Sequence, residues 1–375
     1  MKKILAGFLC LISLQFSFAQ TTTTRVITTG VPFLLVAADA RAAGMADNGV
    51  ATSADVFSQQ WNPSKYAFSN DKQGFSVGYT PYLVELVNDI SLSQVTYFNK
   101  YNERSAFAAS IRYFSLGEIE LRETAEATPN VVKPAEYALD VSYALKLSDY
   151  FSMSVAGRFI RSNLRIPTAG ENSAAASSFA FDVSGFHQSE EMAFNNFNGR
   201  LRWGFNFQNL GPKINYDKSQ GDTGANFLPS NMKIGAGFDF ILDDYNKVTL
   251  NAEVDKLLVP TPIEPKKVDL NGDGDTTDAN EDGVAQAIID YNKIGWVEGI
   301  FKSFGDAPDG LSEELKEFTY SIGTEYSYQD SFAFRLGYFN ESPQKGARRS
   351  ASLGAGFKYN AIKVDVSYLF AISKV

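Results

Sequence analysis

Apolar and polar side chains alternate in about a dozen segments of this chain, each near ten residues long. In the last segment, positions 362, 364, 366, 368 and 370 are Ile, Val, Val, Tyr and Phe, while positions 363, 365 and 367 are Lys, Asp and Ser. The same period of two marks 137–145, 201–207 and 232–240. Successive residues of a strand point to opposite faces, so each segment predicts a strand with one apolar face. Such strands along most of a chain are typical of a transmembrane β-barrel.

Thirteen strands can be counted from Gly74 onwards: 74–80, 90–100, 105–116, 135–147, 150–161, 178–188, 200–210, 231–242, 247–258, 317–328, 331–341, 349–359 and 361–371. Short and long connections alternate, as in barrels with short periplasmic turns and long outer loops, and the longest loop is 259–316. An antiparallel barrel with both ends in the periplasm needs an even number of strands. We therefore expect an all-β fold, a barrel of fourteen strands over residues 74–375, with the last strand missing after Val375.

The first nineteen residues predict a signal peptide. Lys2 and Lys3 precede the apolar stretch 4–18, and Ala19 ends a small-residue cleavage site. The only cysteine, Cys10, is expected to leave with the peptide, so the mature chain has no disulfide and no thiolate metal site.

Residues 20–73 lack the strand alternation, although Phe33, Leu34, Phe57 and Trp61 call for burial. Irregular backbone exposed to lipid loses its hydrogen bonds, so we expect this segment to form a plug inside the barrel. The alternative is a periplasmic arm.

The charge balance excludes one class of partner. Without Lys2 and Lys3 the chain has 32 basic and 43 acidic residues. Nucleic-acid binding requires clustered Lys and Arg, so we expect no nucleic-acid partner. The barrel pattern instead predicts contact with outer-membrane lipid.

Charged residues of both signs are predicted on the lumen face of the strands. The interleaved signs favour ion-paired packing against the plug, with a path for a solute as the alternative. The residues are Arg112, Asp140, Lys146, Arg158, Asp182, Arg202, Lys233, Asp239, Glu253, Asp255, Glu325, Arg335 and Lys363.

No catalytic site is predicted. Glu253 and Asp255 could pair as acid and base, but barrels carry many such pairs. His187 is the only histidine, and with no cysteine in the mature chain it does not assemble a triad or a typical zinc site.

The loop 259–316 contains a calcium-loop pattern. Asp269, Asn271 and Asp273 occupy positions 1, 3 and 5, Gly274 allows the turn at position 6, and Asp275 follows. Glu281 falls one place after the position of the usual closing ligand. A calcium site and a solvated acidic loop are the two interpretations.

A helix with a wide apolar face is predicted over 284–304. Such a face on an outer loop must pack on the rim, hold a hydrophobic ligand or meet a partner. The candidate partner-binding residues are Ile288, Ile294, Trp296, Val297, Ile300, Phe301 and Phe304.

Three motifs resemble the PorV family, outer-membrane components of the type IX secretion system of Bacteroidetes. The first lies in the plug segment and has two parts. They are Asp39-Ala-Arg41-Ala-Ala-Gly44-Met45 and, further along, Trp61-Asn62-Pro63. The others are the stretch 208–212, Gln-Asn-Leu-Gly-Pro, and 335–339, Arg-Leu-Gly-Tyr-Phe. The resemblance spans nearly the whole mature chain, except for the family's last strand.

The resemblance implies a FadL-like barrel of fourteen strands with an N-terminal plug, and no enzymatic activity. It further implies that the protein binds the C-terminal signal domains of secreted proteins at the translocon barrel and passes them to a surface attachment complex. The alternative is a FadL-like channel for hydrophobic small molecules, with the apolar loop as the capture site and the plug as the gate.

Overall fold

Strands that alternate apolar and polar residues account for most of the described chain. The structure is a computed structural model and describes residues 24–84, 87, 89–122, 128–164, 175–216, 225–262, 272, 274 and 284–372. The predicted signal peptide lies outside these residues. All thirteen predicted segments form strands, and the predicted fold class is confirmed.

The strands are antiparallel and follow chain order in one sheet, β1-β2-β3-β6-β7-β8-β10-β13-β14-β15-β16-β17-β18, with β9 paired to β10 as the fourteenth strand. Their bounds are β1 Gln73–Pro81, β2 Ile90–Lys100, β3 Ser105–Leu116, β6 Ala135–Lys146, β7 Phe151–Asn163, β8 Ala176–Gln188, β9 Met192–Ala193, β10 Asn198–Leu210, β13 Asn231–Ile241, β14 Asn246–Leu257, β15 Phe318–Tyr328, β16 Phe332–Asn340, β17 Arg349–Tyr359 and β18 Ile362–Ala371. Two small hairpins, β4 Ile119–Leu121 with β5 Asn130–Val132 and β11 Ile214–Asn215 with β12 Ala225–Asn226, lie in long loops.

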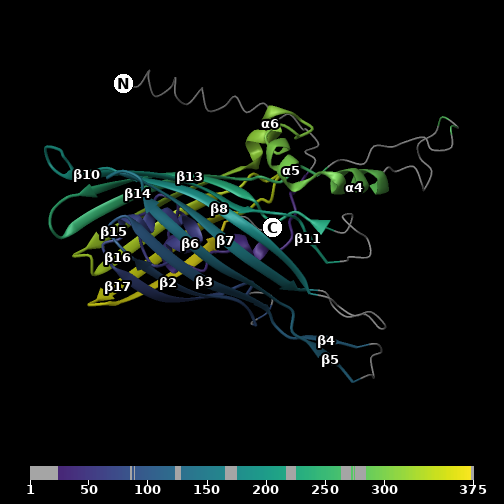
Figure 1. The fold of residues 1–375 in the computed structure, drawn as a ribbon, viewed down its shortest axis with the longest axis horizontal. Coiled ribbons are helices and arrows are strands. Elements are labelled where there is room, and N and C mark those ends of the chain that lie inside the picture. Colours follow the sequence, from purple (N-terminus) through teal and green to yellow (C-terminus); the bar gives the residue numbers. More distant parts are fainter. Residues whose placement is uncertain are drawn as a thin grey trace, which may run out of the picture.

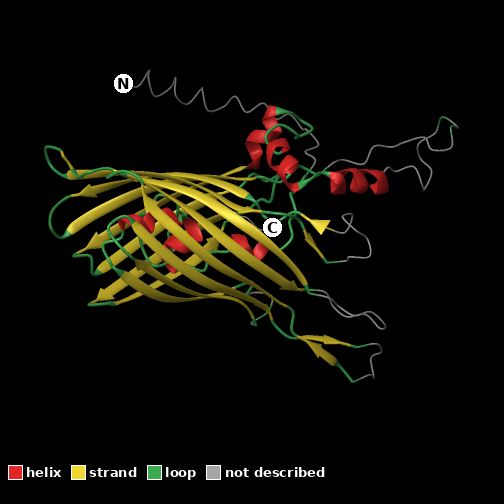
Figure 2. Cartoon of the chain, in the orientation of Figure 1, coloured by secondary structure: helices red, strands yellow, loops and turns green. Residues whose placement is uncertain are grey.

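The sheet curves around the N-terminal segment (Figures 1 and 2). That segment, residues 24–72, is the plug, and it contains η1 Pro32–Leu35, α2 Ala40–Ala43, α3 Ser58–Trp61 and η2 Pro63–Phe68. The helix η2 contacts β2, β3, β6, β7 and β8, while α2 contacts β17 and β18. Because the plug touches strands from both ends of the strand order, the barrel wall surrounds it.

The two ends of the barrel differ. Short turns and the β9 connection lie at one end, and the long loops lie at the other. We call these the short-turn end and the long-loop end; in outer-membrane barrels, short turns usually lie in the periplasm and long loops outside.

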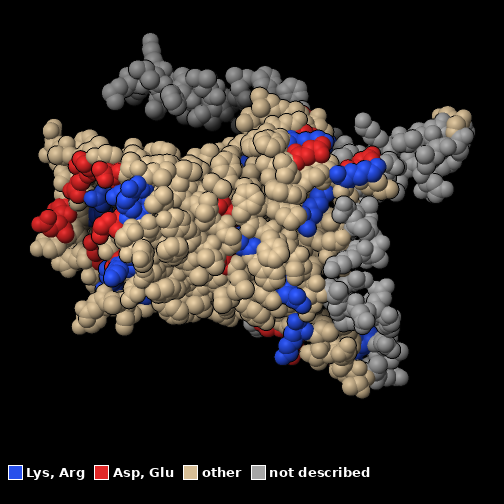
Figure 3. Space-filling model, in the orientation of Figure 1, with Lys and Arg blue, Asp and Glu red and all other residues tan. Residues whose placement is uncertain are grey.

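The side chains follow an inside-out pattern. On β13, Lys233 and Asp239 are buried towards the lumen, whereas Ile234 points outwards and is half exposed. The outer wall between the two ends is mostly free of charge in the view of Figure 3, and charged residues gather at the short-turn end. This surface suits the hydrocarbon of a bilayer.

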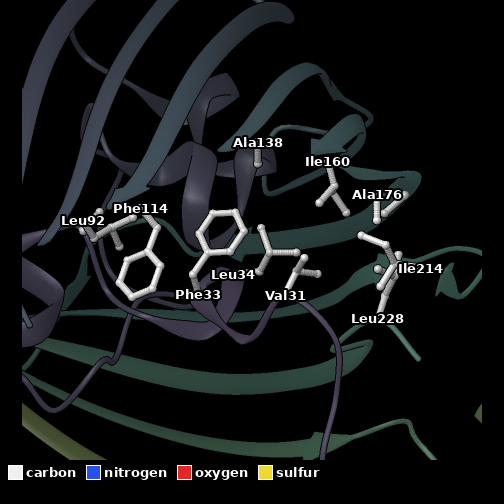
Figure 4. Close-up of a cluster of buried hydrophobic side chains, with 12 residues drawn as sticks. Val31, Phe33, Leu34, Leu92, Phe114, Ala138, Ile160, Ala176, Ile214 and Leu228 are labelled. Atoms are coloured by element: carbon white, nitrogen blue, oxygen red, sulfur yellow. The ribbon is translucent and has the colours of Figure 1, made fainter. Parts of the chain in front are cut away.

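The largest buried apolar cluster lies where the plug begins. Val31, Phe33 and Leu34 of the plug pack against wall residues, with the Phe33 and Phe114 rings stacked 5.9 Å apart (Figure 4). The wall contributes Leu92, Phe114, Ala138, Ile160, Ala176 and Ala180.

The loop between β14 and β15 carries the helices at the long-loop end. They are α4 Val284–Lys293, α5 Trp296–Lys302, α6 Leu311–Glu314 and η4 Leu315–Glu317. The predicted single helix over 284–304 is therefore two helices, because the chain breaks at Ile294 and Gly295. None of the helices in the described ranges is long and apolar enough to cross a bilayer.

Candidate functional site: the plug and the outer rim

Asp39 fixes the start of α2. It lies at the N-cap, where one carboxylate oxygen accepts a hydrogen bond from the Arg41 backbone N–H at 2.8 Å. The other oxygen accepts from the Trp61 indole at 3.2 Å. One buried carboxylate thus joins the two halves of the plug motif predicted from the sequence.

Arg41 connects the plug to the wall. Its guanidinium binds both carboxylate oxygens of Glu325 in β15, at 3.0 and 2.8 Å, and binds Asp55 within the plug at 2.8 Å. Glu325 also accepts from Arg335 at 2.6 Å, and Arg335 donates to Asp365 of β18 at 2.7 Å. Charge-assisted bidentate pairs are strong and directional, so this chain of contacts orients α2 against β15, β16 and β18.

Glycines allow the plug backbone to touch the wall directly. A Cβ on Gly44 would lie 3.0 Å from the Gly354 Cα, and a Cβ on Gly337 would lie 2.3 Å from the Ala46 backbone nitrogen. A side chain at Gly337 would therefore push α2 away from the wall. Gly44 in the predicted motif serves close packing.

Asn62 occupies the centre of the second motif and is fully buried. Its side-chain oxygen accepts from the Ser64 backbone N–H, which caps η2, and Pro63 begins that helix. Its amide donates to the carbonyls of Val50 and of Gly185 in β8, both at 3.0 Å. The Asn206 side chain donates to the Trp61 carbonyl from β10 at 2.7 Å. Trp61-Asn62-Pro63 is thus a second anchor, on β8 and β10, whereas Arg41 binds β15.

Glu253 is engaged with the plug. One oxygen accepts from the backbone N–H groups of Gly49 and Val50, at 2.9 and 3.0 Å. Lys233 lies between Glu253 and Asp255, at 3.3 and 2.6 Å. The two carboxylates therefore bind one ammonium between them and hold the plug.

The remaining predicted lumen residues are also tied together. Arg112 and Arg158 both pair with Asp140, and Arg158 pairs with Asp182. Arg202 pairs with Asp239, and Lys363 with Asp365. The Lys146 ammonium lies 5.0 Å from the centre of the Phe68 ring. The expected ion-paired packing is observed in the lumen.

The sequence reasoning missed a charged cluster at the long-loop end. Lys256 of β14 pairs with Glu314 and Glu317, and Lys345 pairs with Glu313 and Glu317, both at 2.8 Å. Arg25, at the start of the described plug, reaches Glu313 at 2.7 Å. We call these six residues the rim cluster. The only signal in the sequence was the spacing of Glu313, Glu314 and Glu317 on one helical face.

Burial and ion pairing act in opposite directions on Glu313. Burial raises its pKa, but hydrogen bonds from Lys345, the Asp309 N–H and Arg25 outweigh burial and lower the pKa from 4.5 to about 2. The pKa of Glu317 is lowered as well, because Lys256, Lys345 and Thr261 donate to it against the effect of burial. Both carboxylates are therefore ionised at neutral pH.

The candidate partner-binding residues fall on different sides of α5. Trp296 and Ile300 are partly buried, and the Trp296 ring meets the Phe181 ring of β8 edge-on at 6.3 Å. Val297, Phe301 and Phe304 are exposed. Ile294 lies at the break between the helices and is partly buried, whereas the side chain of Ile288 is outside the described residues.

The candidate calcium ligands lie outside the described residues. Those are Asp269, Asn271, Asp273, Asp275 and Glu281. Of the loop between them, Gly272 and Gly274 are described, with φ of 76° and 83°. In the described ranges, no three His, Cys, Asp or Glu side chains are grouped to hold a metal ion.

A plug bonded to several strands of an antiparallel barrel wall defines an outer-membrane β-barrel protein with an internal plug. The chain belongs to the PorV family, since the family model described as "Type IX secretion system protein PorV" matches residues 19–264. It is therefore an outer-membrane protein of the type IX secretion system. The family match ends at residue 264, so the helices α4, α5 and α6 lie outside the matched residues.

Solved structures with similar folds were also found. The Pseudomonas putida toluene transporter TodX is 11% identical with a TM-score of 0.45, over 92% of this chain and 94% of that one. A Pseudomonas aeruginosa FadL homologue is 13% identical with a TM-score of 0.42, over 93% and 91%. The Ralstonia pickettii toluene transporter TbuX is 10% identical with a TM-score of 0.43, over 89% and 92%. No curated protein matched the chain.

Proposed function

We propose that this protein binds the C-terminal signal domains of secreted proteins at the type IX translocon barrel and passes them to a surface attachment complex. It does so as a docking protein without catalytic activity. Family membership supports the secretion system as its setting. The role within that system is the part that we infer.

The anchoring of the plug carries the proposal. Arg41 binds β15, Glu253 of β14 binds the backbone at Gly49 and Val50, and Asn62 binds β8. Removing one partner of a buried ion pair costs about 3–5 kcal/mol, so opening the lumen would require several such losses together. A protein that works with its lumen filled must bind its cargo outside the lumen, at the long-loop end.

The docking surface is proposed on α4 and α5. It comprises Ile288, Ile294, Trp296, Val297, Ile300, Phe301 and Phe304. Since Trp296 already contacts Phe181, the exposed part of this set is Val297, Phe301 and Phe304. Val297 and Phe301 are exposed, and the Phe304 ring, also exposed, has one contact with the wall, 5.8 Å from the Lys256 ammonium of β14. A partner that meets these side chains would approach from the side, as a neighbouring barrel in the membrane would.

The alternative function is a channel for hydrophobic small molecules. One observation favours it: a pocket of about 440 Å³ at the long-loop end, lined by Thr29, Gly30, Val31, Pro32, Leu164, Tyr216 and Asn226. A hydrophobic molecule held there would still have to displace the plug before it could cross.

Affinity purification from native outer membranes distinguishes the two functions. A tagged chain should bring along the translocon barrel and proteins with C-terminal signal domains, identified by mass spectrometry. Co-purification of neither, together with uptake of a hydrophobic solute that depends on this protein, would support the channel.

A further inference from the structure

In the segment formed by α6 and η4, the three glutamates are buried and the two leucines are exposed, while Lys316 is partly buried. Glu313, Glu314 and Glu317 are buried in the rim cluster. Leu311 and Leu315 point outwards, with 74% and 54% of their surface exposed. A segment that faces water has the opposite arrangement, because exposing large apolar side chains to water is unfavourable. The barrel strands show the same inside-out arrangement, since they face lipid.

The helix α5 is amphipathic in a related way. Gly299 and Ser303 are buried, and a Cβ on Gly299 would lie 2.9 Å from the Phe227 ring and 3.1 Å from Pro260. Val297 and Phe301 are exposed, with 74% of Phe301 accessible. The charged pair of Glu298 and Lys302, 2.7 Å apart, occupies a separate flank. This order of buried, apolar and charged sides is that of a helix lying at a membrane surface.

The apolar side of α5 continues the lipid-facing surface of the wall. Leu210, the last residue of β10, pairs with Phe181, so residues 176–180 of β8 extend beyond β10. On the outside of β8, Phe179 and Phe181 are exposed, and Trp296 meets the Phe181 ring. The helices α5 and α6 lie outside the sheet near the long-loop end (Figures 1 and 2).

We propose that the outward side of α5, α6 and η4, formed by Val297, Phe301, Phe304, Leu311 and Leu315, is embedded in the acyl chains of the outer leaflet. The rim cluster holds the segment in place from the lumen side. Exposed apolar patches of this kind mark membrane or protein contact, and continuity with Phe179 and Phe181 selects lipid. This inference rests on the outer-membrane barrel and describes the protein without its partner, which would displace lipid from Val297, Phe301 and Phe304 when it docks from the side.

Single-cysteine labelling tests the proposal, because Cys10 is the only native cysteine and lies in the predicted signal peptide. The variants Phe301→Cys and Leu315→Cys are labelled with an environment-sensitive fluorophore and reconstituted in phosphatidylcholine nanodiscs. Phe179→Cys is the lipid-facing control. Asp309→Cys, exposed in the same loop, is the water-facing control. Quenching is measured with a lipid that carries a spin label near its head group and with aqueous iodide.

We expect labels at 301 and 315 to be quenched by the spin-labelled lipid by the same factor as at 179, with blue-shifted emission and little quenching by iodide. Quenching like that at 309 would overturn the proposal and leave this side facing water. Protection from both quenchers would also overturn it, since another protein copy would then cover the surface. Neither of these two outcomes tests the proposed role in secretion, because that role is measured separately, by co-purification from outer membranes.

Discussion

The guanidinium of Arg41 binds both oxygens of Glu325, a residue 284 positions later in the chain. This contact joins the plug to β15 and, through Arg335 and Asp365, to β18. The ion pair is buried, so its main effect is to hold the plug in one orientation inside the wall.

Replacing Glu325 with Gln should loosen the plug. Arg41 and Arg335 would both lose a buried anionic partner, at a cost of about 3 kcal/mol. We expect faster proteolysis within residues 40–60 and a lower thermal midpoint in detergent. The matched control is Asp330→Asn, which breaks the exposed pair with Lys247 and should change neither. If proteolysis and the thermal midpoint are unchanged in Glu325→Gln, backbone packing alone retains the plug.

Asn62→Ala should destabilise the second anchor. The substitution removes the cap of η2 and leaves the buried carbonyls of Val50 and Gly185 without this donor, at a cost of about 2 kcal/mol. Hydrogen exchange at residues 58–66 should accelerate. Asn196→Ala, at an exposed position in the β8–β10 connection, is the control. Equal exchange in the two variants would contradict an anchoring role for Asn62.

The rim cluster should depend on pH. A carboxyl whose folded pKa is depressed contributes stability that is fully present above its usual pKa and is lost as pH falls through the folded pKa. For Glu313 that window runs from 4.5 down to about 2. A fluorophore on Leu311→Cys should report detachment of α6 in this window. Lys345→Met removes a donor to Glu313, so it should move the midpoint to higher pH; an unmoved midpoint would mean that another group titrates.

The loop with Asp269, Asn271, Asp273, Asp275 and Glu281 should bind Ca²⁺, because carboxylates at alternate positions repel one another unless a cation lies between them. We expect a dissociation constant on the order of 0.1–1 mM, typical of extracellular sites. Isothermal titration should show heat that is lost in the Asp269→Asn/Asp273→Asn double variant and kept in Asp309→Asn. Absence of binding at millimolar calcium in the native chain would favour the solvated acidic loop.

The strands could be predicted from the sequence because a period of two reports directly which face of a strand is apolar. All thirteen positions were found in this way. The partners of the plug could not be predicted, since the pairs of Arg41 with Glu325 and of Asn62 with Gly185 join distant parts of the chain. The break at Gly295 was missed because helical spacing continues across it. The rim cluster was missed because Lys256, Lys345 and Arg25 lie in three separate segments.

A disulfide between the plug and the wall tests whether the protein works with its lumen filled. A Cβ on Gly235 of β13 would lie 3.4 Å from the Ala51 Cβ, close to the spacing of a disulfide, so Ala51→Cys/Gly235→Cys should lock the plug in place. Surface display of proteins with C-terminal signal domains is measured in oxidised and reduced cells, with Ala51→Ser/Gly235→Ser as control. We expect equal display with the plug locked or free. Loss of display on locking, restored by reductant, would contradict this expectation.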